Sequence, residues 1–137
     1  KRRILFICTG NSCRSQMAEG FAYKYLTKHF IKSAGTHPQS VNLMAIEVMN
    51  EIGIDISKHY SKSILDEDLK LFDIIITLCG GAKDECVNLN AFSKKHVHWD
   101  LEDPANVIGT YGEKLNFYII IRDQIETKIK SLCNELQ

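Results

Sequence analysis

The strongest constraint on the fold is the segment Asp73–Leu78 (DIIITL), which is almost continuously apolar and rich in β-branched residues. Such a run is typical of a strand buried on both faces, as in a parallel sheet covered by helices. Ile4–Cys8 is a further short apolar run that ends at Thr9 and Gly10, and Ile31–Ala34 is a second short strand candidate, closed by Gly35. Lys95–Trp99 is a weaker fourth candidate. The pattern therefore predicts a small, largely buried sheet.

Helical patterns separate these strands. From Ser15 onward, apolar residues recur every three to four positions, and a second stripe runs from Leu43 to Ile52, with Gly53 as its C-cap. The same spacing predicts a long amphipathic helix over Tyr118–Leu136. Strands that alternate with helices pair in parallel through right-handed crossovers. We therefore expect an α/β fold, a three-layer sandwich with helices on both faces of the sheet.

Composition limits the possible partners. The length suits one domain, so residues 1–137 are expected to fold as a single unit. Seventeen basic and seventeen acidic residues cancel, which gives no indication of a nucleic-acid or membrane partner. The apolar run after Lys1, Arg2 and Arg3 ends after five residues, too short for an export signal. We therefore expect a cytoplasmic protein, with a monomer as the default state. Five cysteines, an odd number, then indicate reactive thiols rather than a disulfide framework.

The segment Cys8–Ser15 (CTGNSCRS) joins the first expected strand to the first helix, at the edge where ligands bind in α/β sheets. A loop that closes onto a helix N-terminus directs backbone N–H groups at one point and favours an anion there. Gly10 allows the tight turn, and Arg14 offers a planar fork for a tetrahedral oxyanion. The expected oxyanion-binding residues are Thr9, Gly10, Asn11, Ser12, Cys13 and Arg14. Cys8 should be a thiolate nucleophile at the base of this cradle, with the Ser15 hydroxyl donating to its sulfur.

The spacing Cys-x5-Arg alone is a weak signal, and the alternative is a buried strand residue Cys8 with a surface Arg14. A strand before the loop, a helix after it, a glycine inside and a serine at its end favour the oxyanion site. Asp103 precedes Pro104, which stiffens a turn after the last expected strand. That position suits a general acid that protonates a leaving oxygen. A turn without catalytic function is the simpler alternative, and Glu102 is a weaker candidate for the acid.

Two more thiols bear on the chemistry of such a site. Cys79 directly follows the strongest strand, and Cys86 lies seven positions on, across a stretch with Gly80 and Gly81 in which we expect flexibility. Two thiols can deliver two electrons by forming a disulfide, which a phosphatase does not need. Inert buried cysteines are one alternative. A zinc site is another, with poor spacing for its ligands, which would be Cys79, Cys86, His96 and His98.

These motifs together resemble the low-molecular-weight protein tyrosine phosphatase superfamily, and more closely its thioredoxin-coupled arsenate reductase branch. The resemblance covers nearly the whole chain. It rests on CTGNSCRSQMAEGF, on TLC with a second cysteine seven positions on, and on HWDLEDPA. It implies a parallel sheet of the four expected strands in the order 2-1-3-4. Phosphatases of the superfamily commonly carry an aromatic residue after Asp-Pro, and Ala105 at this position favours the reductase branch.

The resemblance implies a relay that reduces arsenate to arsenite. Cys8 attacks arsenate with Asp103 as the acid. Cys79 then attacks the Cys8 sulfur and releases arsenite, and Cys86 finally forms a disulfide with Cys79. Thioredoxin is the expected reductant of this disulfide, with glutaredoxin as the alternative donor. Phosphate or sulfate should also occupy the loop, and Cys13 is expected to take no catalytic step.

Some members of this branch bind potassium behind the loop, through residues that match Asn11, Glu19 and Ser33 and through an acidic residue. The matching acidic position carries Lys62. We expect the Lys62 ammonium to replace the ion and to contact Asn11 or Glu19, so no tightly bound cofactor or metal is expected. A solvated surface lysine is the alternative. Asn11 should brace the loop with its side chain.

Two other functions are compatible with these residues. A small phosphatase for phosphotyrosine or aryl phosphates needs the loop and Asp103 but neither Cys79 nor Cys86. A thiol redox sensor needs the cysteines but no oxyanion cradle, and a cysteine phosphocarrier needs neither Arg14 nor Asp103. Cys133, near the end of the C-terminal helix, is expected to be structural.

Overall fold

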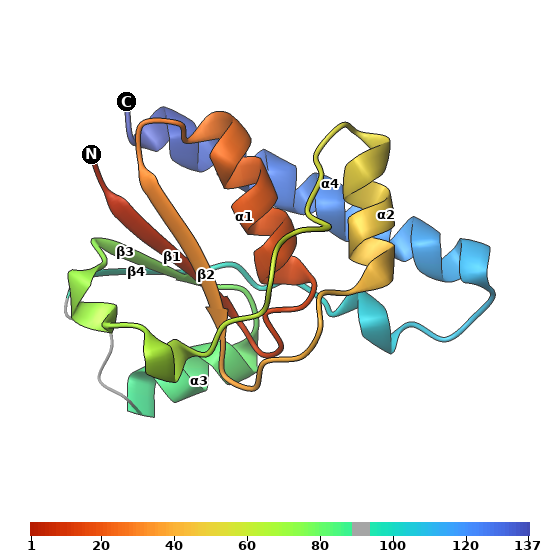
Figure 1. Cartoon of the computed structure of the whole chain (residues 1–137), viewed down its shortest axis with the longest axis horizontal. Helices are drawn as coiled ribbons and strands as arrows, with labels where there is room; N and C mark the ends of the chain where they lie inside the picture. Colours follow the sequence, from red (N-terminus) through yellow and green to blue (C-terminus); the bar gives the residue numbers. More distant parts are fainter. Residues whose placement is uncertain (89–93) are drawn as a thin grey trace.

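The computed structural model describes residues 1–88 and 94–137 (Figure 1). Strands and helices alternate along the chain, as the sequence pattern predicts. The strands are β1 (Arg3–Cys8), β2 (Phe30–Gly35), β3 (Ile74–Thr77) and β4 (Lys95–His98). The helices are α1 (Arg14–Tyr25), α2 (Leu43–Glu51), α3 (Gly80–Asn88) and α4 (Tyr111–Glu135). Short 3₁₀ turns lie at Ile64–Asp66, Leu69–Leu71 and Pro104–Asn106.

The four strands form one parallel sheet in the order β2-β1-β3-β4, which confirms the order that the resemblance implies. Cys8 pairs with Gly35 on one side of β1. On the other side, Ile7 pairs with Thr77, which in turn pairs with His98. Because all the strands run in the same direction, the segments that follow β1, β3 and β4 begin at the same edge. This is the edge at which α/β sheets bind ligands.

Helices cover both faces of this sheet, so the three-layer architecture is confirmed. On one face, α1 and α2 pack against α4 and against each other. On the opposite side, α3 lies against β1 and β3 (Figure 1). The core includes Phe6, Met17 and Phe21, all fully buried, and the ring of Trp99 contacts that of Phe6 at 5.9 Å between centroids. The described residues contain no helix that is both long and apolar enough to cross a bilayer.

The C-terminal helix begins earlier than its apolar stripe indicates. α4 starts at Tyr111 rather than near Tyr118. Thr110 and Glu113 form a capping box, in which each side chain accepts from the backbone N–H of the other residue. The first turn is largely exposed, so it carries no apolar pattern. The start of the helix is therefore set by its cap and not by burial.

The segment after Cys79 is not the flexible linker that its glycines indicate, and that expectation is wrong. It forms α3, whose start is marked by a hydrogen bond from Lys83 N to Cys79 O at 3.2 Å. Ala82 and Cys86 lie one helical turn apart and are both buried, while the two glycines at the start are exposed. Ala82 and Cys86, the buried residues among the described side chains of α3, therefore order a stretch whose glycines weaken its helix propensity.

Candidate active site

The loop between β1 and α1 borders a small cavity at the carboxyl edge of the sheet. Cys8 ends β1 and Arg14 begins α1, so regular structure fixes both. The cavity measures about 180 Å³, which is room for a tetrahedral oxyanion and a few water molecules. Its lining residues are Cys8, Thr9, Gly10, Ser12, Cys13, Arg14, Gln39, Asn42, Asp103 and Ala105. Of the expected oxyanion-binding residues, Asn11 is not among them.

Backbone contacts turn the N–H groups of this loop toward the cavity. Four loop carbonyls accept hydrogen bonds at 2.8–3.2 Å from backbone N–H groups of the segment after β2; they belong to Cys8, Thr9, Gly10 and Ser12. The C=O and N–H groups of a trans peptide point in opposite directions, so the N–H groups that follow these carbonyls face the cavity side. Such converging N–H groups suit an oxyanion.

Gly35 lets the loop lie directly against β2. A Cβ atom at this position would lie 2.6 Å from Thr9 O and 2.7 Å from Asn11 N. Asn11 has a positive φ of 45°, a conformation that asparagine tolerates better than most residues. The shape of the loop therefore depends on the missing side chain of Gly35 and on asparagine at position 11.

A chain of hydrogen bonds supports the Cys8 sulfur from behind. Ser15 Oγ lies 2.9 Å from Cys8 Sγ, and Asn11 Nδ2 donates to Ser15 Oγ at 2.8 Å. Since Ser15 Oγ accepts from the amide, its own proton is available to the sulfur. A donated hydrogen bond stabilises a thiolate, and the start of α1 adds a favourable field. The arrangement therefore presents a nucleophile to an anion in the cavity.

Arg14 and Asp103 meet at the cavity wall. Arg14 Nη1 donates to Leu101 O at 3.0 Å, and Arg14 Nη2 lies 3.6 Å from Asp103 Oδ2. Asp103 Oδ1 accepts from Ala105 N at 3.0 Å and so caps the 3₁₀ turn that follows. The Asp103 side chain is 34% exposed, so water can reach it. Glu102, the weaker candidate for the acid, is exposed and does not line the cavity.

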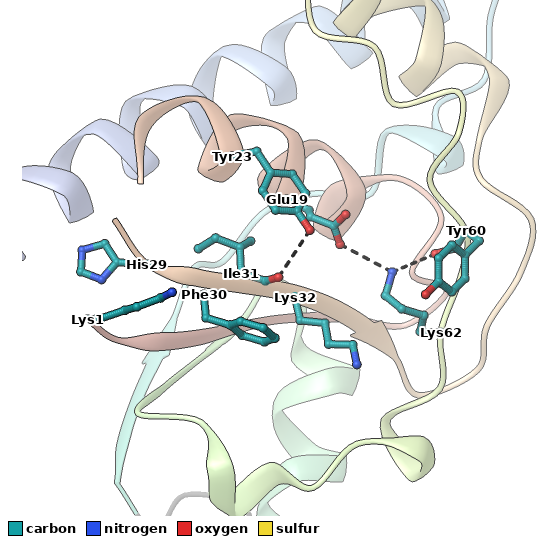
Figure 2. Close-up of a pocket in the computed structure, with 9 residues that line it drawn as sticks. All are labelled: Lys1, Glu19, Tyr23, His29, Phe30, Ile31, Lys32, Tyr60 and Lys62. Carbon is teal, nitrogen blue, oxygen red and sulfur yellow. Dashed lines mark hydrogen bonds and ion pairs between the residues drawn. The ribbon is translucent and has the colours of Figure 1, made fainter. Parts of the chain in front are cut away.

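Behind the loop, the Glu19 carboxylate contacts several polar side chains. Ser33 Oγ donates to Glu19 Oε1 at 2.6 Å and accepts from Asn11 Nδ2 at 2.9 Å. Lys62 Nζ lies 3.5 Å from Glu19 Oε1 and donates to Tyr60 O at 2.9 Å, beside a second cavity of about 360 Å³ (Figure 2). The backbone N–H of Lys62 donates to Asn11 Oδ1 at 2.8 Å. The structure thus joins the residues expected to brace the loop into one network of polar contacts: Asn11, Glu19, Ser33 and Lys62.

His59 is a further partner of Glu19. Its Nδ1 lies 3.3 Å from Glu19 Oε2 and 3.0 Å from Gln16 Oε1. Burial lowers the pKa of His59, Glu19 opposes this effect, and the positive charge of Lys62 adds to it. No local sequence pattern marks His59 or Gln16, because they meet across 43 positions of the chain.

Cys79 lies beside the loop although it does not line the cavity. Its Sγ is 3.3 Å from Thr9 Oγ1 and accepts from Ala82 N at 3.4 Å, at the start of α3. Cys86 is fully buried within α3. Burial raises the pKa of Cys86 to about 11, and the nearby Glu85 and Cys79 act in the same direction. Cys79 is therefore close to the loop, whereas Cys86 is kept protonated inside the fold.

The remaining cysteines have different surroundings. Burial strongly raises the pKa of Cys13, Cys8 and Asp103 add to this effect, and Arg14 opposes it. Cys13 therefore lines the cavity as a neutral thiol. Cys133 is half-buried on α4, and its Sγ donates to a carbonyl at the end of α1 at 3.2 Å. Both are free thiols.

The zinc alternative finds no support in the part of the chain that the structure describes. Thr77 Oγ1 lies between two histidine rings, 2.8 Å from His96 Nε2 and 2.7 Å from His98 Nδ1. In residues 1–88 and 94–137, no group of three or more His, Cys, Asp or Glu side chains is arranged to hold a metal ion. The two histidines of β4 instead share the Thr77 hydroxyl.

The residues that line the cavity include two that sequence analysis does not identify, Gln39 and Asn42. Asn42 is the N-cap of α2, where its side chain accepts from Met44 N and Ala45 N at 2.8 and 3.0 Å. An N-cap asparagine before the helical stripe is a signal that would have placed Asn42 at this edge. No comparable signal exists for Gln39.

Comparison with known proteins places this site in a family. The chain matches the family described as Low molecular weight phosphotyrosine protein phosphatase over residues 3–137. It is 46% identical to an arsenate reductase of Halalkalibacterium halodurans over 134 residues, which is 97% of this chain and 96% of that protein. It is 44% identical to an arsenate reductase of Bacillus subtilis over 131 residues, which is 95% and 94% of the two chains.

Solved structures with this fold include both reductases and phosphatases. One is an arsenate reductase in the phosphate binding state, with a TM-score of 0.84, 32% identity and full coverage of both chains. Another is the YwlE arginine phosphatase from Geobacillus stearothermophilus, with a TM-score of 0.84, 30% identity and coverage of 100% of this chain and 94% of that one. The fold alone therefore does not separate the two chemistries. The family match and the loop geometry agree that this chain belongs to the low molecular weight phosphotyrosine protein phosphatase family.

Proposed function

We propose that this chain is an arsenate reductase that works by a relay of three thiols. The observation that carries the proposal is the position of Cys79, whose sulfur lies 3.3 Å from the hydroxyl of Thr9 in the anion-binding loop. A phosphatase of this fold needs no thiol at that place. The names of the two curated relatives support the same activity.

The cavity favours a small inorganic oxyanion over an aryl ester. Among the described residues, its lining includes Gln39, Asn42 and Ala105 but no aromatic ring that would hold an aryl group. Phosphate is a near-isostere of arsenate, and one structural relative is described in a phosphate binding state. We therefore expect arsenate as substrate, with phosphate or sulfate as competing anions.

In the first step, the Cys8 thiolate attacks arsenic and forms an S–As bond. An As–O bond breaks, and the oxygen leaves as water with a proton from Asp103, which lines the cavity. Arg14 and the N–H groups of the loop hold the remaining oxygens and their negative charge. The 3.6 Å contact between Arg14 and Asp103 would keep the acid close to the bound anion.

In the second step, the Cys79 thiolate attacks the Cys8 sulfur. The S–As bond breaks and its electron pair stays on arsenic, which is reduced from the pentavalent to the trivalent state and leaves as arsenite. A Cys8–Cys79 disulfide remains, so the two sulfurs have supplied the two electrons. The start of α3 and the N–H group of Ala82 stabilise negative charge on Cys79 before this attack.

In the third step, Cys86 attacks Cys79 and releases the Cys8 thiolate. Seven positions of α-helix hold Cα atoms about 10 Å apart, whereas a disulfide requires less than about 7 Å. α3 must therefore unwind for the Cys79–Cys86 disulfide to form. Unwinding also exposes Cys86 to water and removes the burial that raises its pKa to about 11, so its thiolate becomes accessible.

The Cys79–Cys86 disulfide is then exposed for reduction from outside. A dithiol protein reduces such a bond by attack on one of its sulfurs, and we propose thioredoxin as this donor, with glutaredoxin as the other candidate. A relay that is regenerated in this way belongs in a reducing compartment, which supports a cytoplasmic location. No step calls for a second subunit, so a monomer suffices.

The unwinding of α3 can be tested with Gly80→Ala. Among the described residues, nothing lies within 4 Å of a Cβ atom at Gly80, so alanine acts through helix propensity. It should stabilise the helical form by roughly 0.5–1 kcal/mol and slow the last thiol exchange about two- to fivefold. Rapid acid quench with thiol alkylation measures the conversion of the Cys8–Cys79 disulfide to the Cys79–Cys86 disulfide. Gly112→Ala on α4, also in open space, is the matched control and should change no step. An unchanged exchange rate in Gly80→Ala would argue against unwinding.

We also propose that the Lys62 ammonium takes the place of a potassium ion behind the loop. Its Nζ lies 3.5 Å from Glu19 Oε1 and donates to Tyr60 O, and these are the kinds of oxygen that bind a hard cation (Figure 2). The loop would then be braced without an added ion. Arsenate turnover by the wild-type chain should therefore not rise when potassium replaces sodium, and a strong rise would refute this role.

Lys62→Ala should make the chain depend on potassium. The side chains of Lys62 and Glu19 are 11% and 7% exposed, so removal of the cation leaves a largely buried carboxylate. The expected loss of stability in sodium is on the order of 2 kcal/mol, below the usual cost for a buried pair because Glu19 keeps Ser33 and His59. Thermal unfolding in each salt should show partial recovery in potassium. Lys58→Ala, at an exposed lysine of the same segment, should show neither effect.

One incubation tests the proposed function directly. The reduced chain receives one equivalent of arsenate and no reductant. The expected products are one equivalent of arsenite and a chain lighter by about 2 Da, with a peptide map that links Cys79 to Cys86. Phosphate in place of arsenate should leave every thiol reduced. If all the thiols stay reduced with arsenate while an aryl phosphate is hydrolysed with turnover, the chain is a phosphatase and the proposal fails.

A further inference from the structure

The carbonyl of Asn11 is held differently from its neighbours in the loop. The carbonyls of the other residues from Cys8 to Ser12 accept from backbone N–H groups. Asn11 O instead accepts from Gln16 Nε2 at 2.9 Å and from Ser61 Oγ at 2.8 Å. Gln16 is fully buried and Ser61 is half-buried. Two side chains from different segments therefore hold a single carbonyl, and neither of them is among the residues that line the cavity.

Gln16 and Ser61 are themselves fixed by further contacts. Gln16 Nε2 also donates to Tyr60 O at 3.0 Å, and Gln16 Oε1 lies 3.0 Å from His59 Nδ1. Both N–H groups and the oxygen of this amide are thus engaged, so its orientation is defined. The Ser61 hydroxyl also donates to Gln39 O, so its single proton is shared between the Asn11 and Gln39 carbonyls. The two side chains form a rigid support behind the loop.

The direction of the Asn11 carbonyl decides where the next N–H group points. Because C=O and N–H are opposed in a trans peptide, a carbonyl held behind the loop turns the Ser12 N–H toward the cavity that Ser12 lines. Rotation of the Asn11–Ser12 peptide, which changes ψ of Asn11 and φ of Ser12, would remove one donor and aim a carbonyl at the anion.

We propose that Gln16 and Ser61 are positioning residues that orient the Asn11–Ser12 peptide so that the Ser12 N–H donates to the bound oxyanion. They touch neither the anion nor Cys8 and act through the peptide alone. The inference rests on the proposed function only in requiring that the loop binds a tetrahedral oxyanion. It therefore applies equally to arsenate and to phosphate, and phosphate is the convenient probe.

Removal of either side-chain donor should weaken the binding of inorganic phosphate. Ser61→Ala and Gln16→Met each remove one anchor and should reduce affinity about three- to tenfold, as measured by calorimetric titration. The double variant should lose about 10²-fold, the lower end for loss of an oxyanion donor. Ser63→Ala is the matched control, because Ser63 Oγ accepts from Leu65 N at 3.1 Å and does not hold the loop. Ser61→Thr, which keeps the hydroxyl, should bind phosphate nearly as well as the wild type.

Two further measurements distinguish a rotated Asn11–Ser12 peptide from a loop that has lost its order as a whole. The rate of Cys8 alkylation by iodoacetamide depends on the Ser15 contact, which runs through the Asn11 side chain and not through its carbonyl. That rate should stay unchanged in Ser61→Ala. In NMR spectra, the Ser12 amide signal should shift on addition of phosphate in the wild type and stay in place in the double variant.

Three outcomes would overturn the proposal. The first is wild-type phosphate affinity in Ser61→Ala and the double variant, and the second is a Ser12 shift that survives in the double variant. The third is a joint loss of thermal stability and Cys8 reactivity in Ser61→Ala, which would indicate a loosened loop. Should Gln16→Met fail to fold, Ser61→Ala and Ser61→Thr carry the test by themselves. If the phosphate results hold but the chain fails to reduce arsenate, only the proposed function is wrong.

Discussion

Serine at Cys79 or at Cys86 is expected to abolish multiple turnover of arsenate, by roughly 10³-fold or more, because each thiol makes a bond that no other group replaces. The two variants should stop at different points. In Cys79→Ser the Cys8–arsenic adduct forms but nothing attacks its sulfur, so no arsenite appears. In Cys86→Ser one equivalent of arsenite is released, and the chain stops as the Cys8–Cys79 disulfide. The separate stopping points identify the order of the relay.

Two assays on the same samples measure these outcomes. Consumption of reducing cofactor, coupled through thioredoxin and its reductase, reports turnover, and speciation of arsenic after a rapid quench reports the first equivalent. Cys133→Ser is the matched control, since Cys133 is half-buried on α4, does not line the cavity, and donates from its sulfur to a carbonyl at the end of α1. It should turn over like the wild type. Sustained turnover in both Cys79→Ser and Cys86→Ser would rule out the relay. A phosphate affinity equal to that of the wild type in all three variants would confirm that the anion-binding loop is intact.

The burial of Cys86 determines the order in which the thiols of the relay react. A thiol with a pKa of about 11 is almost entirely protonated at neutral pH, and only the thiolate attacks a disulfide. Cys86 therefore does not compete with Cys79 for the first disulfide while α3 is folded. Cys79, at the start of the helix and beside Thr9, is placed to react first. α3 contradicts the flexible linker that was expected after Cys79. It nevertheless explains the order in which the thiols react better than such a linker does.

Local sequence patterns were sufficient for the strands and for the residues that line the cavity from the loop, whereas the order of the strands came from the family resemblance. The β-branched run before Cys79 and the apolar run before the loop mark strands because burial on both faces leaves no polar alternation. Cys8 and Arg14 lie within one continuous strand–loop–helix unit, so their spacing alone brings them to one cavity. Asp103 follows the last strand of a parallel sheet, and the common direction of the strands places it at the same edge.

Contacts between distant segments could not be predicted in this way. α3 has only two described buried positions, Ala82 and Cys86, which are too few for a periodic pattern, and its order comes from packing against the sheet. Ser61 reaches the loop across 50 positions of sequence, and Gln16 reaches Tyr60 across 44. Such contacts depend on how the segment before β3 crosses behind the loop. That path has no signature in composition or periodicity.

Gly35→Ala is expected to lower the affinity for phosphate and arsenate by about 10²-fold, because the loop must move away from β2. A Cβ atom at Gly35 would lie 2.6 Å from Thr9 O and 2.7 Å from Asn11 N, and both are backbone atoms that cannot rotate aside. Gly35 does not have a positive φ, so alanine is permitted by the local backbone and acts through this clash alone. Displacement of the loop would misdirect the N–H groups that follow Cys8.

Overpacking of this kind should also cost about 1–3 kcal/mol of stability, so stability and anion binding must be separated. Gly53→Ala is the control, because Gly53 has a φ of +82° and open space around it. Alanine there should cost about 1–2 kcal/mol through backbone strain and leave the loop untouched. Calorimetric titration with phosphate at a temperature where both variants are folded then isolates the effect on the site. Gly35→Ala should bind far more weakly than Gly53→Ala at similar stability, and equal affinities would show that contact with β2 does not hold the loop in its anion-binding shape.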